Sequence, residues 1–225
     1  MTKHVLGIID AQRGFMPESE GQRLGVAGFG ELTVPHGEKI VPNICRLLNT
    51  FAMYDFSTFT TQDWHPTKTA HFSQQPDFAN TWPRHCVAAT PGAELHPYIE
   101  LPSTNRSFVK GTEPLRNGKE DTSYSAYYAH NRWSDERLPD WLAKVSAETV
   151  YLGGLALEEC VGKSALDLKK KIGVNVTVVT DATAGITPDA SRRMLQNFER
   201  AGVRTATTEQ VIRNISMLAQ GYGRA

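Results

Sequence analysis

Short apolar runs recur along the chain, and each is bounded by polar residues, glycine or proline. We expect strands over residues 4–10, 55–63, 106–110, 149–154 and 174–181, with a short sixth strand over 203–206. These runs are largely apolar throughout and do not alternate between apolar and polar positions. That pattern is typical of strands buried on both faces of a parallel sheet, so it favours a sheet with helices on both sides.

Segments with apolar residues at helical spacing lie between these runs. The spacing predicts helices over residues 37–53, 138–145 and 160–172. Two later helices carry start signals: Thr187 precedes Pro188, and Thr207 with Gln210 matches a capping box. Strands that alternate with helices predict an α/β fold in three layers, with a central, mostly parallel sheet of about six strands. The length of 225 residues fits a single domain over 1–225.

Two long segments, about 12–36 and 64–105, have little regular pattern but contain aromatic residues, prolines and histidines. Loops of that length in a compact domain are usually functional or disordered, and this composition favours a functional role. Ligands of parallel α/β sheets gather at the carboxyl ends of the strands. Four features lie at those ends of the predicted strands: Asp10, Asp63, Lys110 and the turn Gly153–Cys160. The sequence therefore predicts a site where these strands end.

The second loop contains a set of residues that suits a metal ion. Asp63 and His65 are separated by one residue, so an extended chain directs both side chains to the same side. His71 and His85 follow, and carboxylate with imidazole suits Zn, Mn or Fe(II). The alternative is that these are loop histidines hydrogen-bonded to the backbone. The remaining histidines outside the first strand have no such neighbours and are expected at the surface: His36, His96 and His130.

Cys160 stands in the stretch GGLALEECVGKSALD, directly after two glutamates. Negative charge opposes the thiolate form, whereas a helix N-terminus or a nearby Lys110 would favour it. Asp10 could then act as a general acid or base. The alternative is a buried structural thiol, which is the commoner fate of a cysteine and the one expected for Cys45 and Cys86.

Composition limits the cellular compartment and the classes of binding partner that we expect for this chain. Lys and Arg total 24, Asp and Glu total 24, and the net charge is zero, so neither a nucleic acid nor a membrane surface is expected as a partner. Three cysteines make a disulfide framework improbable and favour a reducing, cytoplasmic setting. The apolar start of the chain has the length of a strand, and no run approaches the ~18 apolar residues of a membrane span.

Eight segments, in order, carry a resemblance that covers nearly the whole chain. They are IIDAQRGF (8–15), GELTVPHGEKIVPNI (30–44), QDWHP (62–66), TWPRHCV (81–87), FVKGTEP (108–114), SYSAYY (123–128), GGLALEECVGKSALD (153–167) and TDATAG (180–185). Together they resemble the nicotinamidase branch of the isochorismatase-like cysteine hydrolases. The resemblance implies an isochorismatase-like fold and a metal-dependent amidase that converts nicotinamide to nicotinate and ammonia through a cysteine thioester, in NAD salvage.

The same resemblance implies roles for individual residues. It implies a catalytic triad of Asp10, Lys110 and Cys160, and one divalent metal, with Zn preferred over Fe or Mn, on Asp63, His65 and His85. His71 lies at the spacing of a fourth protein ligand in a subset of members. It also implies an aromatic pocket of Phe15, Trp82 and Tyr124, and a cis peptide bond between Leu155 and Ala156 that aims the amides of Ala156 and Cys160 at an oxyanion.

The sequence departs from the family pattern before the cysteine, where Leu157-Glu158 replaces Thr-Asp. This change keeps a carboxylate but places it on a longer side chain. It leaves open that the substrate is a different compound. The alternatives are another small amide or an N-carbamoyl compound, a vinyl ether of the isochorismatase type, or a non-catalytic ligand-binding relative. We expect a small-molecule amide as substrate. The sequence is compatible with a homo-oligomer, and it leaves open whether residues 115–122 cover the site.

Overall fold

Seven strands form one sheet in the part of the chain that the computed structural model describes, residues 3–113 and 121–222. The strands are β1 Lys3–Ile9, β2 Thr58–Asp63, β3 Asn105–Lys110, β4 His130–Asn131, β5 Ala147–Leu155, β6 Asn175–Ala184 and β7 Arg204–Ala206. Their order is β4-β3-β2-β1-β5-β6-β7, and only β4 runs antiparallel to its neighbour. The six predicted strands are present, whereas the two residues of β4 are too few to produce a pattern.

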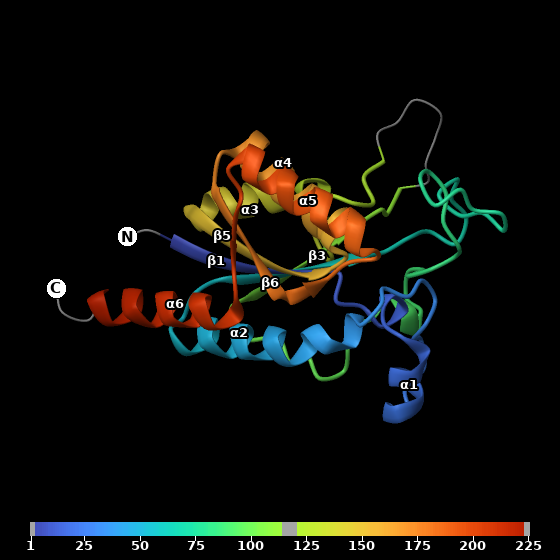
Figure 1. Cartoon of the computed structure of the whole chain (residues 1–225), viewed down its shortest axis with the longest axis horizontal. Helices are drawn as coiled ribbons and strands as arrows, with labels where there is room; N and C mark the ends of the chain where they lie inside the picture. Colours follow the sequence, from blue (N-terminus) through green and yellow to red (C-terminus); the bar gives the residue numbers. More distant parts are fainter. Residues whose placement is uncertain (1–2, 114–120, 223–225) are drawn as a thin grey trace.

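Helices cover both faces of this sheet. They are α1 Glu18–Leu24, α2 Val41–Met53, α3 Leu138–Lys144, α4 Gly162–Asp167, α5 Pro188–Ala201 and α6 Thr208–Tyr222. Single 3₁₀ turns occur at Arg13–Phe15, Gly37–Ile40, Pro91–Ala93 and Ala126–Tyr128, and wider π-type turns at Leu157–Val161 and Leu168–Ile172. Helices α2 and α6 lie on one face, and α3, α4 and α5 on the other (Figure 1). Each face has its own cluster of buried apolar side chains, so the predicted three-layer architecture is confirmed.

The two helix starts predicted from capping signals are confirmed. The hydroxyl of Thr187 accepts a hydrogen bond from the amide of Ala190 at 3.2 Å, at the N-cap of α5. Thr207 and Gln210 bond reciprocally before α6: the Thr207 amide donates to Gln210 Oε1 at 2.8 Å, and the Gln210 amide donates to Thr207 Oγ1 at 3.3 Å. Such reciprocal bonds satisfy amides that have no partner inside the helix.

The segment 12–36 is more regular than the sequence indicated, because it contains α1. This short helix brings Glu20 against His96, whose Nε2 lies 3.3 Å from Glu20 Oε1. His96 is therefore buried, with 1% of its surface exposed, and the expectation that it lies at the surface is wrong. A polar helix of seven residues has too few turns to leave a hydrophobic stripe, so neither α1 nor the buried histidine was visible in the sequence.

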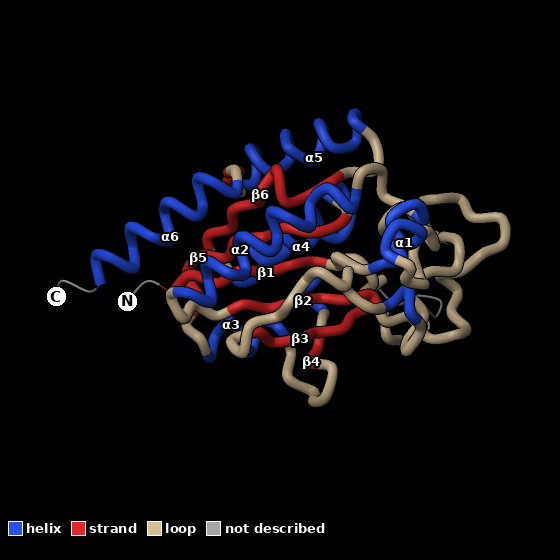
Figure 2. Tube along the Cα trace, turned by 90° about the horizontal axis from the view of Figure 1, so that it is seen from below, coloured by secondary structure: helices blue, strands red, loops and turns tan. Residues whose placement is uncertain are grey.

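The strand order brings the carboxyl ends of β3, β2, β1 and β5 to one edge of the sheet (Figure 2). In the register, Asp63 pairs with Lys110, and Ile9, which precedes Asp10, pairs with Gly154 of β5. Residues 114–120, which include most of the segment considered as a cover, lie outside the described residues. None of the described helices is long and apolar enough to cross a bilayer.

Candidate active site

The ammonium of Lys110 is the centre of a buried cluster at this edge. Its Nζ lies 2.7 Å from Asp10 Oδ2 and 2.5 Å from Asp63 Oδ1, and it donates to Cys160 Sγ at 3.3 Å. It also donates to the carbonyl of Ser123. Only 1% of the surface of Lys110 is exposed. A buried charge requires partners of opposite sign, and the two carboxylates supply them.

The charges of this cluster control each other's pKa values. Burial raises the pKa of Asp10 to about 6, although the charge of Lys110 lowers it. Burial also pushes the pKa of Asp63 upward, but Lys110 and His65 hold it below its ordinary value. For Lys110, burial lowers the pKa, and the two carboxylates outweigh that effect and raise it well above the ordinary value. Lys110 is therefore charged at neutral pH. Of the two carboxyl groups, Asp10 has the pKa that lies closer to neutral pH.

Cys160 is buried beside these charges as a thiol. Burial raises its pKa well above the ordinary value, against the attraction of Lys110. This direction is opposite to the one expected from a helix start, because the loss of solvent around the sulfur and the nearby carboxylates of Asp10 and Asp63 outweigh the attraction of Lys110. The turn before Cys160 requires glycine at Gly154, where φ is +119° and a Cβ atom would lie 1.8 Å from the carbonyl oxygen of Ile9. The peptide bond between Leu155 and Ala156, one residue further on, is cis.

The two glutamates before Cys160 are engaged by other groups. Glu158 is buried, and its Oε1 accepts hydrogen bonds from the amides of Ile186 at 2.9 Å and Thr187 at 3.0 Å. Glu159 Oε2 forms an ion pair with Lys163 at 2.6 Å. Glu158 thus holds the start of α5 against the turn that carries the cysteine.

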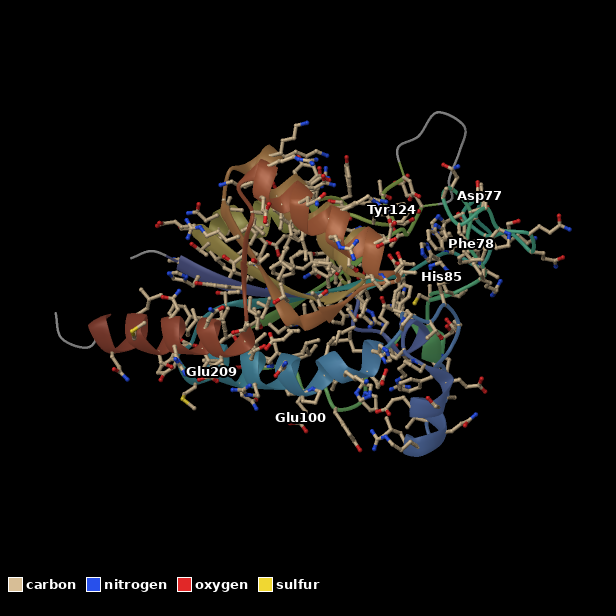
Figure 3. All side chains as sticks on the ribbon, viewed as in Figure 1. Asp77, Phe78, His85, Glu100, Tyr124 and Glu209 are labelled. Atoms are coloured by element: carbon tan, nitrogen blue, oxygen red, sulfur yellow. The ribbon has the colours of Figure 1, made fainter. Side chains whose placement is uncertain are left out.

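The predicted metal ligands fall into two neighbouring groups. His65, His71 and His85 are buried, and one nitrogen from each lies within 4.8 Å of the others. Asp63 lies between this histidine cluster and Lys110: its Oδ2 is 3.7 Å from His65 Nε2, and its Oδ1 contacts Lys110. His85 lies at the end of the molecule that also carries Phe78 and Tyr124 (Figure 3).

The hydrogen bonds of the histidines fit a metal ion. His65 Nδ1 lies 3.1 Å from the carbonyl of Gly111, and His85 Nδ1 lies 2.7 Å from the carbonyl of Pro83. These bonds leave both Nε2 atoms as lone-pair donors, and His65 Nε2 is buried without a hydrogen-bond partner. Burial lowers the pKa of His85 to about 3, so its ring is neutral, as metal binding requires. Three imidazoles and one carboxylate suit zinc.

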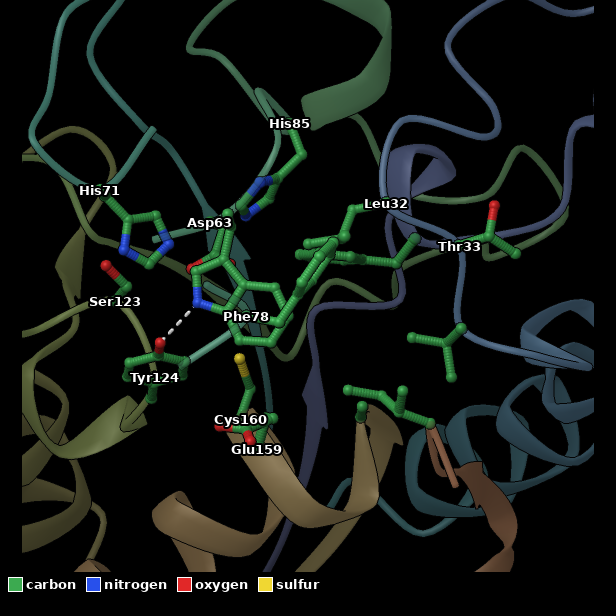
Figure 4. Close-up of a pocket in the computed structure, with 15 residues that line it drawn as sticks. Leu32, Thr33, Asp63, His71, Phe78, His85, Ser123, Tyr124, Glu159 and Cys160 are labelled. Carbon is green, nitrogen blue, oxygen red and sulfur yellow. Dashed lines mark hydrogen bonds between the residues drawn. The ribbon is translucent and has the colours of Figure 1, made fainter. Parts of the chain in front are cut away.

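A cavity of about 180 Å³ opens over Cys160, His71 and His85, and its lining is mostly apolar (Figure 4). The three aromatic residues predicted for a pocket all line it: Phe15, Trp82 and Tyr124. The indole Nε1 of Trp82 donates to the hydroxyl of Tyr124 at 2.8 Å. The Phe15 ring lies 5.4 Å from the His85 ring. The cavity therefore has room for a small flat ring beside the Cys160 thiol and the histidine cluster.

Sequence reasoning missed other residues of the cavity wall: Leu32, Val34, Phe78 and Ile186. Phe78 is 59% exposed, has φ of +55°, and lies edge-to-face on Trp82 with 5.9 Å between ring centres. Asp77 accepts bonds from three amides of the turn that follows, those of Ala79, Asn80 and Thr81. An aspartate ahead of small polar residues is a turn signal. This signal could have predicted an ordered turn at Asp77 that carries Phe78.

Known proteins resemble the chain along almost its whole length. The isochorismatase domain matches residues 4–210. A nicotinamidase of Acinetobacter baylyi is 31% identical over 219 residues, which cover 91% of this chain and 92% of that protein. A pyrazinamidase of Pyrococcus horikoshii, solved in complex with zinc, is 31% identical with a TM-score of 0.72, over 91% of this chain and 99% of that chain. A protein of L. infantum solved in complex with nicotinate is 28% identical with a TM-score of 0.72, over 92% and 94% of the two chains.

Proposed function

The chain belongs to the isochorismatase domain family, and from this premise we propose that it is a metal-dependent nicotinamidase that uses a cysteine thioester. The similarity to nicotinamidases and a pyrazinamidase over about nine-tenths of the chain supports an amide hydrolase. The observation that carries the proposal is the contact of Lys110 Nζ with both Asp10 and Cys160 Sγ beneath the cavity. Hydrolysis of nicotinamide would return nicotinate to NAD salvage.

The first half of the reaction forms the thioester. Asp10 takes the proton of the Cys160 thiol as the sulfur attacks the carboxamide carbon, so a C–S bond forms and the carbonyl oxygen becomes an oxyanion. The amides of Ala156 and Cys160 are proposed as its donors, and one such donor is worth roughly 3–4 kcal/mol. Asp10 then returns the proton to the leaving nitrogen, the C–N bond breaks, and ammonia departs.

The second half releases the product. Asp10 takes a proton from a water molecule that attacks the thioester carbon, and the C–S bond breaks. The proton returns to sulfur, the new carboxylic acid loses its own proton to solvent, and nicotinate leaves. Lys110 remains protonated throughout, since its pKa is raised well above the ordinary value by Asp10 and Asp63. Its role is to hold the carboxylate and the sulfur together while negative charge moves between them.

The metal site and the cavity wall orient the substrate. His65, His71 and His85, with Asp63 beside them, would hold a divalent cation, zinc by preference, which when bound would supply a positive charge that attracts the ring nitrogen of the substrate. Phe15, Trp82 and Tyr124 would contact the faces and edges of the ring.

The test is ammonia release from nicotinamide by the purified protein, before and after removal of metal by a chelator. We expect release that is lost after chelation and restored by zinc. Cys160→Ala should abolish turnover but leave zinc binding intact, and Cys45→Ala, at a cysteine outside the cavity, is the matched control. Turnover by Cys160→Ala would contradict the thioester. Metal binding without activity on nicotinamide would move the substrate to another small amide or an N-carbamoyl compound.

A further inference from the structure

A carboxylate outside the reaction described above lies behind the histidine cluster. Glu31 belongs to the loop that supplies Leu32 and Val34 to the cavity wall. Its Oε2 accepts a hydrogen bond from the amide of Cys86 at 2.7 Å, a distance typical of a charge-assisted bond. The loop that lines the cavity is thereby joined to the loop that carries His85.

Two glycines make room for this carboxylate. A Cβ atom on Gly92 would lie 2.1 Å from Glu31 Oε2, and the three atoms nearest to it all belong to Glu31. A Cβ atom on Gly14 would lie 2.8 Å from the same oxygen. Because any side chain at these positions would displace the carboxylate, the surroundings are shaped to receive it.

The residue whose amide Glu31 binds, Cys86, connects two of the histidines. Cys86 follows His85 directly, and its carbonyl accepts a hydrogen bond from the amide of His65 at 3.1 Å. Cys86 has φ of +44°, a conformation that a residue with a Cβ atom adopts only when its surroundings impose it. The bond from Glu31 is one of those constraints.

Glu31 is not needed to hold its own loop. The amides of Gly30, Leu32 and Val34 donate to carbonyls of residues 14–16 at 2.9, 2.8 and 2.9 Å, so the loop is anchored by its backbone. Loss of the Glu31 side chain should therefore act on the Cys86 peptide and leave the cavity wall in place.

We propose that Glu31 is a positioning residue that fixes the Cys86 peptide and thereby sets His65 and His85 for metal binding. The proposal rests on the metal site of the proposed function. Groups that orient metal ligands typically contribute 10–100-fold to metal affinity, and we expect an effect of that size here. Glu31 carries the effect as an acceptor for one amide, so a glutamine should preserve most of it.

The test is the zinc dissociation constant of each variant, measured by competition with a chromophoric chelator, without substrate. Glu31→Ala should bind zinc about 10–100-fold more weakly than the wild type. Glu31→Gln should lose clearly less, and Glu100→Ala, at an exposed carboxylate labelled in Figure 3, should bind zinc as the wild type does. Unfolding curves of the metal-free variants establish that each is folded.

A second substitution tests the same contact without truncating the glutamate. Gly92→Ala should weaken zinc binding by displacing the carboxylate, and it should add little further loss in the Glu31→Ala background, where that space is free. Three outcomes would each overturn the proposal. They are wild-type zinc affinity in folded Glu31→Ala, equal losses of affinity in Glu31→Ala and Glu31→Gln, and additive losses in the double variant. A wild type that binds no zinc would overturn the metal dependence of the proposed function and this proposal with it, whereas zinc binding without amidase activity would overturn the function alone.

Discussion

Replacement of Glu158 by alanine tests the departure from the family pattern beside Cys160. The variant removes the acceptor for the amides of Ile186 and Thr187. A hydrogen bond to a charged group contributes about 1.5–3 kcal/mol, so the two bonds together contribute about 3–6 kcal/mol. Part of this is offset, because Glu158 Oε2 is buried without a hydrogen-bond partner and alanine relieves that cost. We expect a net loss of about 3 kcal/mol in the free energy of unfolding.

The assay is thermal unfolding of the metal-free protein, followed by kinetics. For a chain of this length, 1 kcal/mol shifts Tm by about 2–4 °C, so Glu158→Ala should lower Tm by about 6–12 °C. Ile186 lines the cavity, and release of its backbone should raise KM for nicotinamide more than it lowers kcat. Glu158→Gln keeps one acceptor oxygen, so both effects should be smaller.

The adjacent glutamate is the matched control for stability. Glu159 pairs with Lys163 four residues later, and both side chains are partly exposed, at 27% and 42%. Such pairs are worth about 0.3–0.5 kcal/mol, so Glu159→Ala should shift Tm by no more than about 2 °C. Equal shifts in Glu158→Ala and Glu159→Ala would refute the reasoning, as would an unchanged Tm in Glu158→Ala.

Three further outcomes are expected. Phe78→Ala should raise KM about 2- to 13-fold with little change in kcat, because Phe78 lines the cavity and a ring contact with the substrate would be worth about 0.5–1.5 kcal/mol. Trp133→Ala, at a residue 76% exposed, should leave KM unchanged in the same assay. Burial lowers the pKa of His96 below its ordinary value of 6.5. As the pH falls, the unfolded chain therefore binds a proton on His96 at a higher pH than the folded protein does. Stability should therefore fall below pH 6.5, by at most about 1.4 kcal/mol per pH unit, and urea titrations should find a shallower fall in His96→Gln. Zinc at 100 times its dissociation constant should stabilise the protein by about 2.7 kcal/mol, which calorimetry with a chelator would detect as a lower Tm.

Most of the fold could be predicted because its signals are local. Apolar runs located the six longer strands, and Thr187 and Thr207 located two helix starts by contacts that span three residues. Helix α1 left no such signal because it is short and polar, and His96 is buried only because α1 supplies Glu20. The elements that were missed depend on partners distant in the sequence.

The candidate site divides in the same way. Strand ends indicated Asp10, Asp63 and Lys110, since the carboxyl ends of neighbouring parallel strands meet at one edge. The bond of Glu158 to Ile186 joins residues 28 positions apart, and that of Glu31 to Cys86 joins residues 55 positions apart. No periodicity or spacing rule links such pairs, so these contacts had to come from the structure.

Charge balance is a second property that only the structure provides. Two carboxylates, Asp10 and Asp63, share one ammonium, Lys110, in a region with almost no solvent contact. When Asp10 is ionised the cluster has one uncompensated negative charge, and the neighbouring His85 is neutral because burial lowers its pKa to about 3. An unpaired charge in such surroundings is costly, and a divalent cation on the histidines and Asp63 would compensate it. The proposed metal site and the proposed catalytic base are therefore electrostatically one unit, although the sequence presents them as separate motifs.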